Sequence, residues 1–567
     1  MNRRDFSALT LGALLLLALP AGPAPAATVT IINNDGAGEG FNDPTPVAPI
    51  GGNPGTTLGA QRLYIFNYAA SIWGSILPSP VTIQVTAQFN SQTCDSVSGV
   101  LGSASATSVY ANFPGAEFSN TWYPQALANK LSGVDQGPTT ADINATFNSD
   151  VDNSTCLGSS NWYYGTDGNE GTNIELLPVV LHELGHGLGF ATFANASTGQ
   201  LLSNTPDVYT HFMLDKSSGL HWNEMSNVQR KNSAVNTGNL VWDGPAVQFM
   251  SQHYLYHRPE LLVNSPGSVA GSYNAVLAGF GPPLDGTGLT ANVVQVVDNT
   301  APTSDACETI VNGAALNGNI ALIDRGTCTF VFKVKAAQNA GAIGVIMVNN
   351  VAGAPISMGG TDPTITIPSV MISQTDGATL KTALGSGTVN ATLHLSATQL
   401  AGAFPDGDVL LYAPNPVESG SSLSHWDDTA APDLLMEPFI SDSLHDTIDL
   451  TRQAFEDIGW LPRVTAVEPV ASAPLPSFRV RSMPNPFRPS TIISLELPTS
   501  GSTRVDVFDI HGRLVKELMN NWMPAGNHAV TWDGTDGRGS RVGAGIYFSR
   551  VTSGGRSSSQ RLVKLDG

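Results

Sequence analysis

Two histidines four residues apart, His182 and His186, constrain this chain more than any other feature; they belong to the run HELGHGLGF at residues 182–190. On a helix, residues i and i+4 share a face, so both imidazoles can bind one metal ion. Zinc accepts imidazole nitrogen at about 2.0–2.1 Å and, in a catalytic site, keeps one position open for water. Glu183 follows the first histidine directly, where its carboxylate can take a proton from that water as a general base.

The surrounding sequence predicts that this run lies on a helix. Apolar residues recur at helical spacing from residue 174 to residue 184, which indicates an amphipathic helix over 173–190. Gly187 and Gly189 are expected to end the helix beneath the metal. The alternative is a buried helix that carries two hydrogen-bonded structural histidines.

A catalytic zinc needs a third protein ligand, and the local sequence does not supply one. The compact pattern HExxHxxGxxH would place a histidine at position 192, where this chain has Thr192. A thermolysin-like site would use a glutamate from a following helix. The nearest downstream glutamate is Glu224, in a Trp/Asn-rich stretch without a clear helical period.

Three later motifs resemble the leishmanolysin branch of the metzincin zinc peptidases: Ser-His-Trp at 424–426, Leu-Met-Glu-Pro at 435–438, and a segment that ends in Asp-Ile-Gly at 457–459. The resemblance implies that His182, His186 and His425 bind zinc and that Glu183 is the base. It also implies that Met436 forms a hydrophobic floor under the metal. The alternatives are a surface role for His425 and ordinary core packing for Met436.

A β-rich segment separates His425 from the first two histidines. Residues 259–396 resemble a protease-associated (PA) domain through the runs NGNIALIDR (317–325), GTCTFVFK (326–333), AAQNAGA (336–342) and IPSV (367–370). In that family the domain is a non-catalytic β-rich module that influences substrate access or binding. A folded insert returns the chain close to its starting point, so the long separation is no obstacle to a shared zinc site. Asp324 and Arg325 are interpreted as turn and packing residues.

The last part of the chain has a different composition from the rest. Residues 478–567 hold 12 Lys/Arg against 7 Asp/Glu, whereas the whole chain has a net charge of −20. Alternating strands separated by Gly/Asp turns predict a β-sandwich. The runs PNPF (484–487), VFDIHGR (507–513), WDG (532–534) and GIYF (545–548) resemble the C-terminal Ig-like modules of secreted proteins that carry type IX-like sorting signals. This resemblance implies contact with secretion or cell-surface machinery.

The N-terminus predicts export. Arg3 and Arg4 precede an apolar run at 8–19 and a Pro/Ala stretch, as in a signal peptide, with the mature chain starting near Ala27. Whether the general secretory or the twin-arginine route is used stays open. No segment has the roughly 18 apolar residues of a membrane span, and the acidic net charge excludes a nucleic-acid binder.

Four cysteines suit an oxidising compartment, and no CxxC zinc motif occurs. Of the three possible pairings, Cys94–Cys156 with Cys307–Cys328 is favoured, because each pair then lies within one predicted domain. A cysteine pair like the second is also common in the PA family. Free buried thiols are the alternative.

Together these features predict a multidomain α+β protein. Its parts are a signal peptide (1–26), a metzincin-type catalytic domain in two pieces (27–258 and 397–462), the PA domain inserted between them (259–396), a linker (463–478) and a C-terminal Ig-like sorting domain (479–567). The expected function is a secreted or cell-surface zinc endopeptidase acting on proteins or peptides. The rivals are an inactive zinc-containing surface binding protein and a thermolysin-like peptidase with a glutamate ligand. Structural calcium, at Asp150 and Asp152 or at Asp533 and Asp536, is a secondary expectation.

Overall fold

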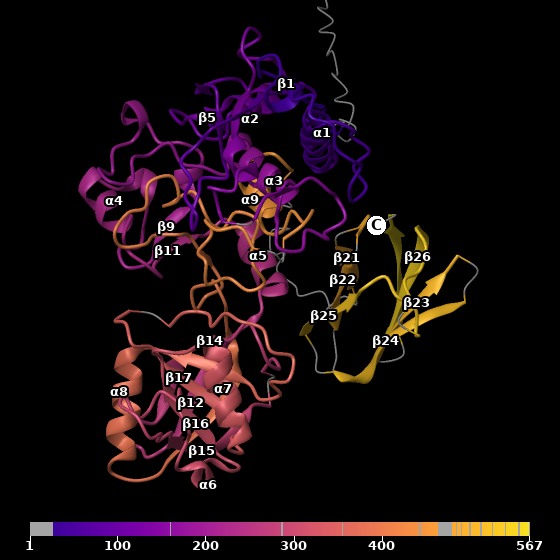
Figure 1. Cartoon of the computed structure of the whole chain (residues 1–567). Helices are drawn as coiled ribbons and strands as arrows, with labels where there is room; N and C mark the ends of the chain where they lie inside the picture. The colour runs from indigo at the N-terminus through magenta and orange to yellow at the C-terminus, as the bar shows by residue number, and fades with distance from the viewer. Residues whose placement is uncertain are drawn as a thin grey trace, which may run out of the picture.

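The computed structural model describes residues 26–462 and 479–565, with short gaps at 159, 285–286, 354, 442–443, 484, 489, 498–500, 511–512, 524–525, 539 and 554–555. The predicted signal peptide, up to residue 25, and the predicted linker lie outside the described residues. Three bodies follow one another in Figure 1: a main domain (26–256 and 401–462), an inserted domain (257–400) and a C-terminal domain (479–565).

The main domain is built on a four-stranded sheet in the order β1-β2-β6-β3. Strands β1 (Val29–Asn33), β2 (Ile83–Asn90) and β6 (Ile143–Asn148) are parallel. Strand β3 (Gly102–Ala106) runs antiparallel to β6 at the edge. The alternating burial of β2 matches its alternating sequence, because one face of the sheet packs against helices.

Two long helices lie beside this sheet (Figure 1): α1 (Leu58–Ile76) and α3 (Leu176–Leu188), which carries the HELGH run. Thr57 caps α1 by accepting the N–H of Ala60. Helix α2 (Gln125–Ser132) and the short strand pairs β4 (Val109–Tyr110) with β5 (Tyr123–Pro124) and β7 (Trp162–Tyr163) with β8 (Ile174–Glu175) connect these elements.

A second small sheet joins the two pieces of the main domain. Its order is β10 (Leu220–His221), β9 (Met213–Asp215), β11 (Leu240–Trp242) and β20 (Val409–Leu410), so its last strand comes after the inserted domain. Helices α4 (Asn227–Ser233) and α5 (Pro245–Tyr254) flank it in the chain, and α9 (Thr451–Asp457) follows later. The pairing of β11 with β20 brings the segment that carries His425 back to the main domain.

The inserted domain has an eight-stranded sheet in the order β13-β12-β19-β15-β16-β17-β18-β14. The bounds of its strands are β12 His257–Ser265, β13 Gly271–Asn274, β14 Val276–Leu277, β15 Leu289–Gln295, β16 Ile320–Asp324, β17 Gly344–Val348, β18 Ser369–Ile372 and β19 Val389–Leu400. Helices α6 (Gly313–Leu316), α7 (Phe330–Asn339) and α8 (Gln374–Leu384) complete it. The domain is joined to the main domain where β12 and β19 pair, and the N–H of Ala401 donates to the carbonyl of Tyr256 at 2.9 Å.

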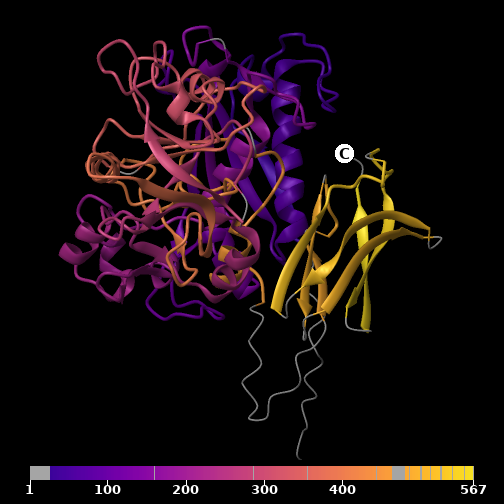
Figure 2. The same cartoon turned by 90° about the horizontal axis from the view of Figure 1, so that it is seen from below.

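The C-terminal domain is the predicted β-sandwich. One sheet contains β21 (Arg479–Met483), β22 (Thr491–Leu497) and β25 (Gly526–Trp532), and the other contains β24 (Leu514–Met523), β23 (Gly501–Asp509), β26 (Gly545–Ser553) and β27 (Arg556–Lys564). Buried Ile493, Val505, Trp532 and Val551 belong to its core. The domain lies beside the rest of the molecule (Figure 2), and Arg488 donates to the hydroxyl of Tyr68 on α1 at 2.7 Å.

The expected elements match the structure with local differences. Apolar residues at helical spacing predict a helix over 58–76, and α1 forms over these residues. The helix expected at 173–190 is α3, which is shorter because Ile174 and Glu175 form a strand. Within the β-rich segment, residues 365–372 have the composition of a strand, but the strand forms only over Ser369–Ile372. Within the described residues, no helix is long and apolar enough to cross a membrane.

Candidate metal centre and active site

Three histidines meet at one point of the main domain. The Nε2 atoms of His182 and His186 are 3.1 Å apart, and each lies 3.2 Å from Nε2 of His425. Three nitrogens bound tetrahedrally to one zinc at about 2.0–2.1 Å would be about 3.3 Å apart. The three ring nitrogens therefore have the spacing that one zinc ion requires, although His425 is 239 residues after His186.

The opposite nitrogen of each ring faces a backbone carbonyl. Nδ1 of His182 lies 2.6 Å from the Leu435 oxygen, Nδ1 of His186 lies 2.8 Å from the Phe190 oxygen, and Nδ1 of His425 lies 2.6 Å from the Ser421 oxygen. A carbonyl only accepts, so each Nδ1 carries the proton and each Nε2 keeps its lone pair. This is how metal-binding histidines are usually oriented.

Burial also keeps the three rings neutral. It lowers the pKa of His182 to about 4, and burial with the neighbouring His182 lowers the pKa of His186 to about 3. Burial, with the two nearby imidazoles, holds the pKa of His425 well below its usual value. Neutral imidazole is the form that binds a metal ion.

Local contacts fix α3 at both ends of the HELGH run. The indole N–H of Trp73 donates to the Leu181 carbonyl at 3.1 Å, and that of Trp460 donates to the Leu188 carbonyl at 2.9 Å. The second bond satisfies a carbonyl at the helix end. Gly189 ends the helix with a φ of 127°, as predicted.

Gly187 has a different role from the one predicted. It does not end the helix, which continues to Leu188. A Cβ at Gly187 would lie 2.4 Å from Cγ2 of Ile143 on β6, so this glycine allows α3 to approach the sheet closely. Such close approach is a common reason for glycine within an element.

The turn around Met436 touches both histidine-bearing segments. The Leu435 carbonyl accepts from His182, and the next carbonyl, that of Met436, accepts the N–H of Trp426 at 2.8 Å. Met436 is fully buried, and a Cβ at Gly185 would lie 2.8 Å from its sulfur. Met436 thus packs directly beneath the helix turn that joins His182 to His186.

The side chain of Glu183 extends from α3 toward the edge strand β3. Only 8% of the residue is exposed, and burial raises the pKa of its carboxyl to about 8, against the lowering effect of the Ala104 backbone N–H. A Cβ at Gly102 would lie 3.1 Å from Cγ of Glu183, so the strand passes directly over this side chain.

The two alternative ligand positions, Thr192 and Glu224, make other contacts. Thr192 donates its hydroxyl to buried Asp207 at 2.8 Å, and its N–H donates to Ser424 Oγ at 3.2 Å. Glu224 accepts the N–H of His221 at 3.3 Å, away from the three histidines. A glutamate-liganded site of the thermolysin type therefore finds no support at Glu224.

One further group of potential ligands occurs among the described residues: Asp298, Asp305 and Glu308 in the inserted domain. Fully buried Lys333 lies 3.7 Å from Asp305 and already supplies a positive charge there.

Structural calcium stays a prediction. Of its candidates, Asp152 pairs with Arg62 at 2.9 Å and Asp533 pairs with Lys516 at 2.8 Å.

Both predicted disulfides are formed, Cys94–Cys156 in the main domain and Cys307–Cys328 in the inserted domain. No free cysteine remains in the chain.

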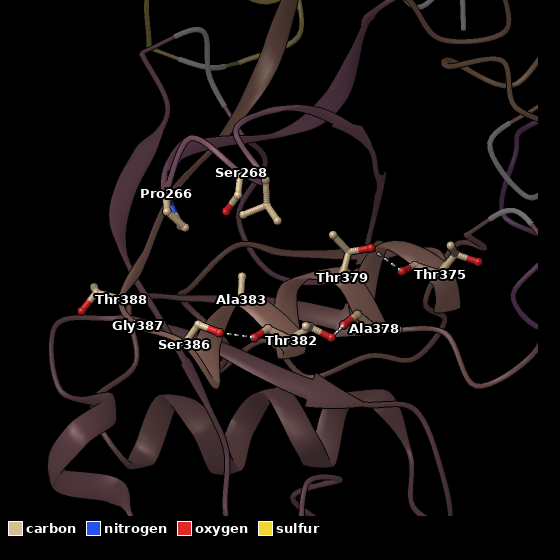
Figure 3. A pocket seen from close by; sticks show the side chains of 11 residues that line it. Pro266, Ser268, Thr375, Ala378, Thr379, Thr382, Ala383, Ser386, Gly387 and Thr388 are labelled. Atoms are coloured by element: carbon tan, nitrogen blue, oxygen red, sulfur yellow. Dashed lines mark hydrogen bonds between the residues drawn. The ribbon is translucent and has the colours of Figure 1, made fainter.

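A pocket in the inserted domain is separate from the histidines. It lies between the turn at 266–269 and one face of α8 (Figure 3). The hydroxyls of Thr379 and Thr382 donate to carbonyls of their own helix. The residues that line the pocket include no ionisable side chain, so it offers no acid, base or charged ligand.

Sequence reasoning missed the groups that orient the histidines. The Leu435, Phe190 and Ser421 carbonyls are backbone atoms, and no residue type marks them. Buried Asp449 accepts the N–H of Leu435 and the hydroxyl of Thr451. The sequence did contain a feature that could have pointed to Asp449, because an aspartate just before a helix, here α9, often caps it.

Three family models match parts of the chain, and one of them extends past residue 259 into the inserted domain. Residues 289–380 match the PA domain family, residues 487–557 match the FlgD Ig-like domain, and residues 65–278 match the SPBPB7E8-like family. The chain is therefore a multidomain α+β protein with a PA domain and a C-terminal Ig-like domain. The matched PA segment lies inside the predicted boundaries 259–396. The metzincin assignment of the main domain stays a prediction.

Several curated proteins are similar to part of the chain. Vacuolar-sorting receptor 1 of Pisum sativum is 31% identical over 143 residues, which cover 24% of this chain and 23% of that protein. Minor extracellular protease Vpr of Bacillus subtilis is 28% identical over 213 residues (37% and 25%). Leucine aminopeptidase 2 of Arthroderma otae is 33% identical over 150 residues (26% and 28%). The chain thus spans about a quarter of the length of these relatives.

Among solved structures, the zinc aminopeptidase BSAP from Bacillus subtilis matches 33% of this chain and 42% of its own, with 21% identity and a TM-score of 0.20. FlgD from P. aeruginosa matches 13% and 60%, with 29% identity and a TM-score of 0.12. TM-scores of 0.20 and 0.12 are too low to support a conclusion about the fold or activity of the whole chain.

Proposed function

We propose that this protein is a zinc-dependent peptidase, and more specifically a secreted endopeptidase of the metzincin type. One observation carries the proposal: three Nε2 atoms lie 3.1–3.2 Å apart, and each ring is oriented by a backbone carbonyl at its other nitrogen. The names of two relatives, an extracellular protease and a leucine aminopeptidase, favour peptide hydrolysis over other metal-dependent reactions.

The protein's own residues would divide the work as follows. His182, His186 and His425 would hold the ion. When bound, zinc supplies a Lewis acid that lowers the pKa of a nearby water toward about 7, and its charge favours the ionised form of Glu183. Glu183 would then accept the proton of the attacking water and pass it to the leaving amine. Its burial beside β3 excludes bulk solvent from this carboxylate.

The edge strand supports an endopeptidase. Within the described residues β3 pairs on one side only, with β6, and it passes over Glu183. An extended peptide can add to such an open edge through backbone hydrogen bonds. This binding mode positions an internal peptide bond at the site and requires no free N-terminus.

Secretion is also proposed. The predicted signal peptide, the two disulfides and the Ig-like C-terminal domain support an extracytoplasmic location, with sorting or surface attachment through the last domain. The rival, an inactive zinc-binding surface protein, is disfavoured by Glu183. This carboxylate is no part of the histidine cluster, and a purely structural zinc site would not need it.

Casein hydrolysis by the wild type and by Glu183→Ala, each with and without chelator, tests the proposal. We expect activity that chelator removes and zinc restores, and a variant that binds zinc but is about 10²–10⁴-fold slower. An unchanged rate in the variant would refute the role of Glu183. Cleavage of an N-terminally blocked peptide separates an endopeptidase from an aminopeptidase, which requires a free amino end.

A further inference from the structure

Asp449 lies outside the histidine cluster but is connected to it through one residue. The carboxylate is buried, with 6% of the residue exposed. Its Oδ2 accepts the backbone N–H of Leu435, and the carbonyl of the same Leu435 accepts from Nδ1 of His182 at 2.6 Å. Only Leu435 therefore separates this carboxylate from a candidate metal ligand.

The other oxygen of Asp449 is fixed to the beginning of α9. Oδ1 accepts the backbone N–H of Thr451 at 3.0 Å and the hydroxyl of Thr451 at 2.8 Å. The carboxylate thus joins a rigid helix start on one side to an irregular turn on the other. Such a bond between two elements fixes the position of the less regular one.

Leu435 needs this support because it has no regular secondary structure. It is almost completely buried and belongs to a turn, so no strand or helix neighbour satisfies its N–H. A buried N–H without an acceptor is costly. The same turn contacts the His425 segment through the Met436 carbonyl and the Trp426 N–H. A shift of Leu435 would consequently affect two of the three histidines.

We propose that Asp449 is a positioning residue of the metal centre, whose carboxylate fixes Leu435 and through it the ring orientation of His182. The inference rests on the proposed function, because it assigns Asp449 to the same site. Outer partners of metal ligands typically change metal affinity by about 10–100-fold when they are removed. Asp449 acts through an intervening residue, so we expect the lower end of this range.

The chain offers a matched control in Asp457, at the end of the helix whose beginning Asp449 contacts. Asp457 is fully buried and accepts hydrogen bonds from the Trp242 indole and from the N–H groups of Ala246 and Val247 at the start of α5. These bonds stabilise packing between α9 and α5, and none of the three reaches the turn at Leu435. Asp449→Asn and Asp457→Asn therefore remove similar charges in different places.

The full-length protein would be studied with two readouts that do not depend on turnover: the zinc Kd by competition with a chelator, and the visible spectrum after cobalt substitution. For Asp449→Asn we expect a zinc Kd about tenfold weaker and shifted cobalt bands. For Asp457→Asn we expect a lower Tm with an unchanged Kd and spectrum. A wild-type Kd and spectrum in Asp449→Asn would overturn the proposal.

If Asp449→Asn does not fold, Thr451→Val provides the test, because it removes the hydroxyl donor to Oδ1 and retains the carboxylate. A weaker zinc Kd than wild type would support the proposal, and an unchanged Kd and cobalt spectrum would overturn it. Failure of the wild type itself to bind zinc would refute the proposed function, which is a separate outcome.

Discussion

Thr192 and His425 provide a decisive pair of substitutions, since both lie near the end of α3 but only one would bind the ion. His425→Ala removes one of the three Nε2 atoms of the cluster. The loss should exceed that from removing an outer partner, so we expect the zinc Kd to weaken by more than about 100-fold and peptidase activity to disappear.

Thr192→Ala should leave zinc binding nearly intact, but the structure predicts a cost in stability. The Thr192 hydroxyl donates to Asp207, which is 2% exposed and also accepts the N–H groups of Phe193 and Thr210. One hydrogen bond to a buried carboxylate is worth about 2 kcal/mol. For a domain of this size that corresponds to a decrease in Tm of roughly 5 °C.

The assay is a zinc titration against a chelator, combined with thermal unfolding at pH 8. His425→Gln is a second variant that fills more of the space left by the imidazole. The reasoning would be refuted if His425→Ala bound zinc as tightly as wild type, or if Thr192→Ala lost zinc without a change in Tm. Either result would move the metal site toward position 192.

Three further predictions follow from other contacts. Residues 257–400 should be removable with a short Gly/Ser bridge, because Tyr256 and Ala401 already share a 2.9 Å hydrogen bond. The shortened protein should still bind zinc, and its activity should change mainly on large substrates. Loss of zinc in a metal assay would contradict this domain boundary. Gly185→Ala should lower both Tm and zinc affinity, since its Cβ would lie 2.8 Å from the Met436 sulfur, whereas an unchanged Tm would show that the sulfur moves freely. Burial raises the pKa of Asp207 from 3.8 to about 6, so between these values the folded state holds a proton that the unfolded state releases, and the free energy of unfolding should fall by about 2 kcal/mol as pH rises from 4 to 6. Asp207→Asn should flatten this part of the plot of Tm against pH. A plot that matches wild type would exclude Asp207 as the group responsible.

The sequence predicted the regular elements well, because periodicity reports which face is buried. Helix α1 matches its apolar spacing, and the strands of the C-terminal sandwich match their alternation. The strand expected at 365–372 was overextended because it begins only after Pro368, and a proline has no N–H to donate to a neighbouring strand. The role predicted for Gly187 was wrong because the neighbour that requires a glycine there, Ile143, is distant in sequence.

The candidate site was predictable only in its side chains. The spacing of His182 and His186 indicates a shared ion on physical grounds, whereas His425 and Met436 rested on a resemblance to known peptidases. The oriented carbonyls of Leu435, Phe190 and Ser421 could not be predicted, because any residue can provide a carbonyl. Their positions depend on the turn at Met436 and on the end of α3, which form only when distant segments pack.

The order of the histidines along the chain has a consequence in time. The ribosome adds His186 239 residues before it reaches His425. At about 5–20 residues per second this interval lasts roughly 12 to 48 s. During it the nascent chain carries His182, Glu183 and His186 but lacks both the third imidazole and the turn that orients the first. If the proposed function holds, a chain that ends before His425 should show no peptidase activity, so the order of synthesis would protect the cell that makes the protein.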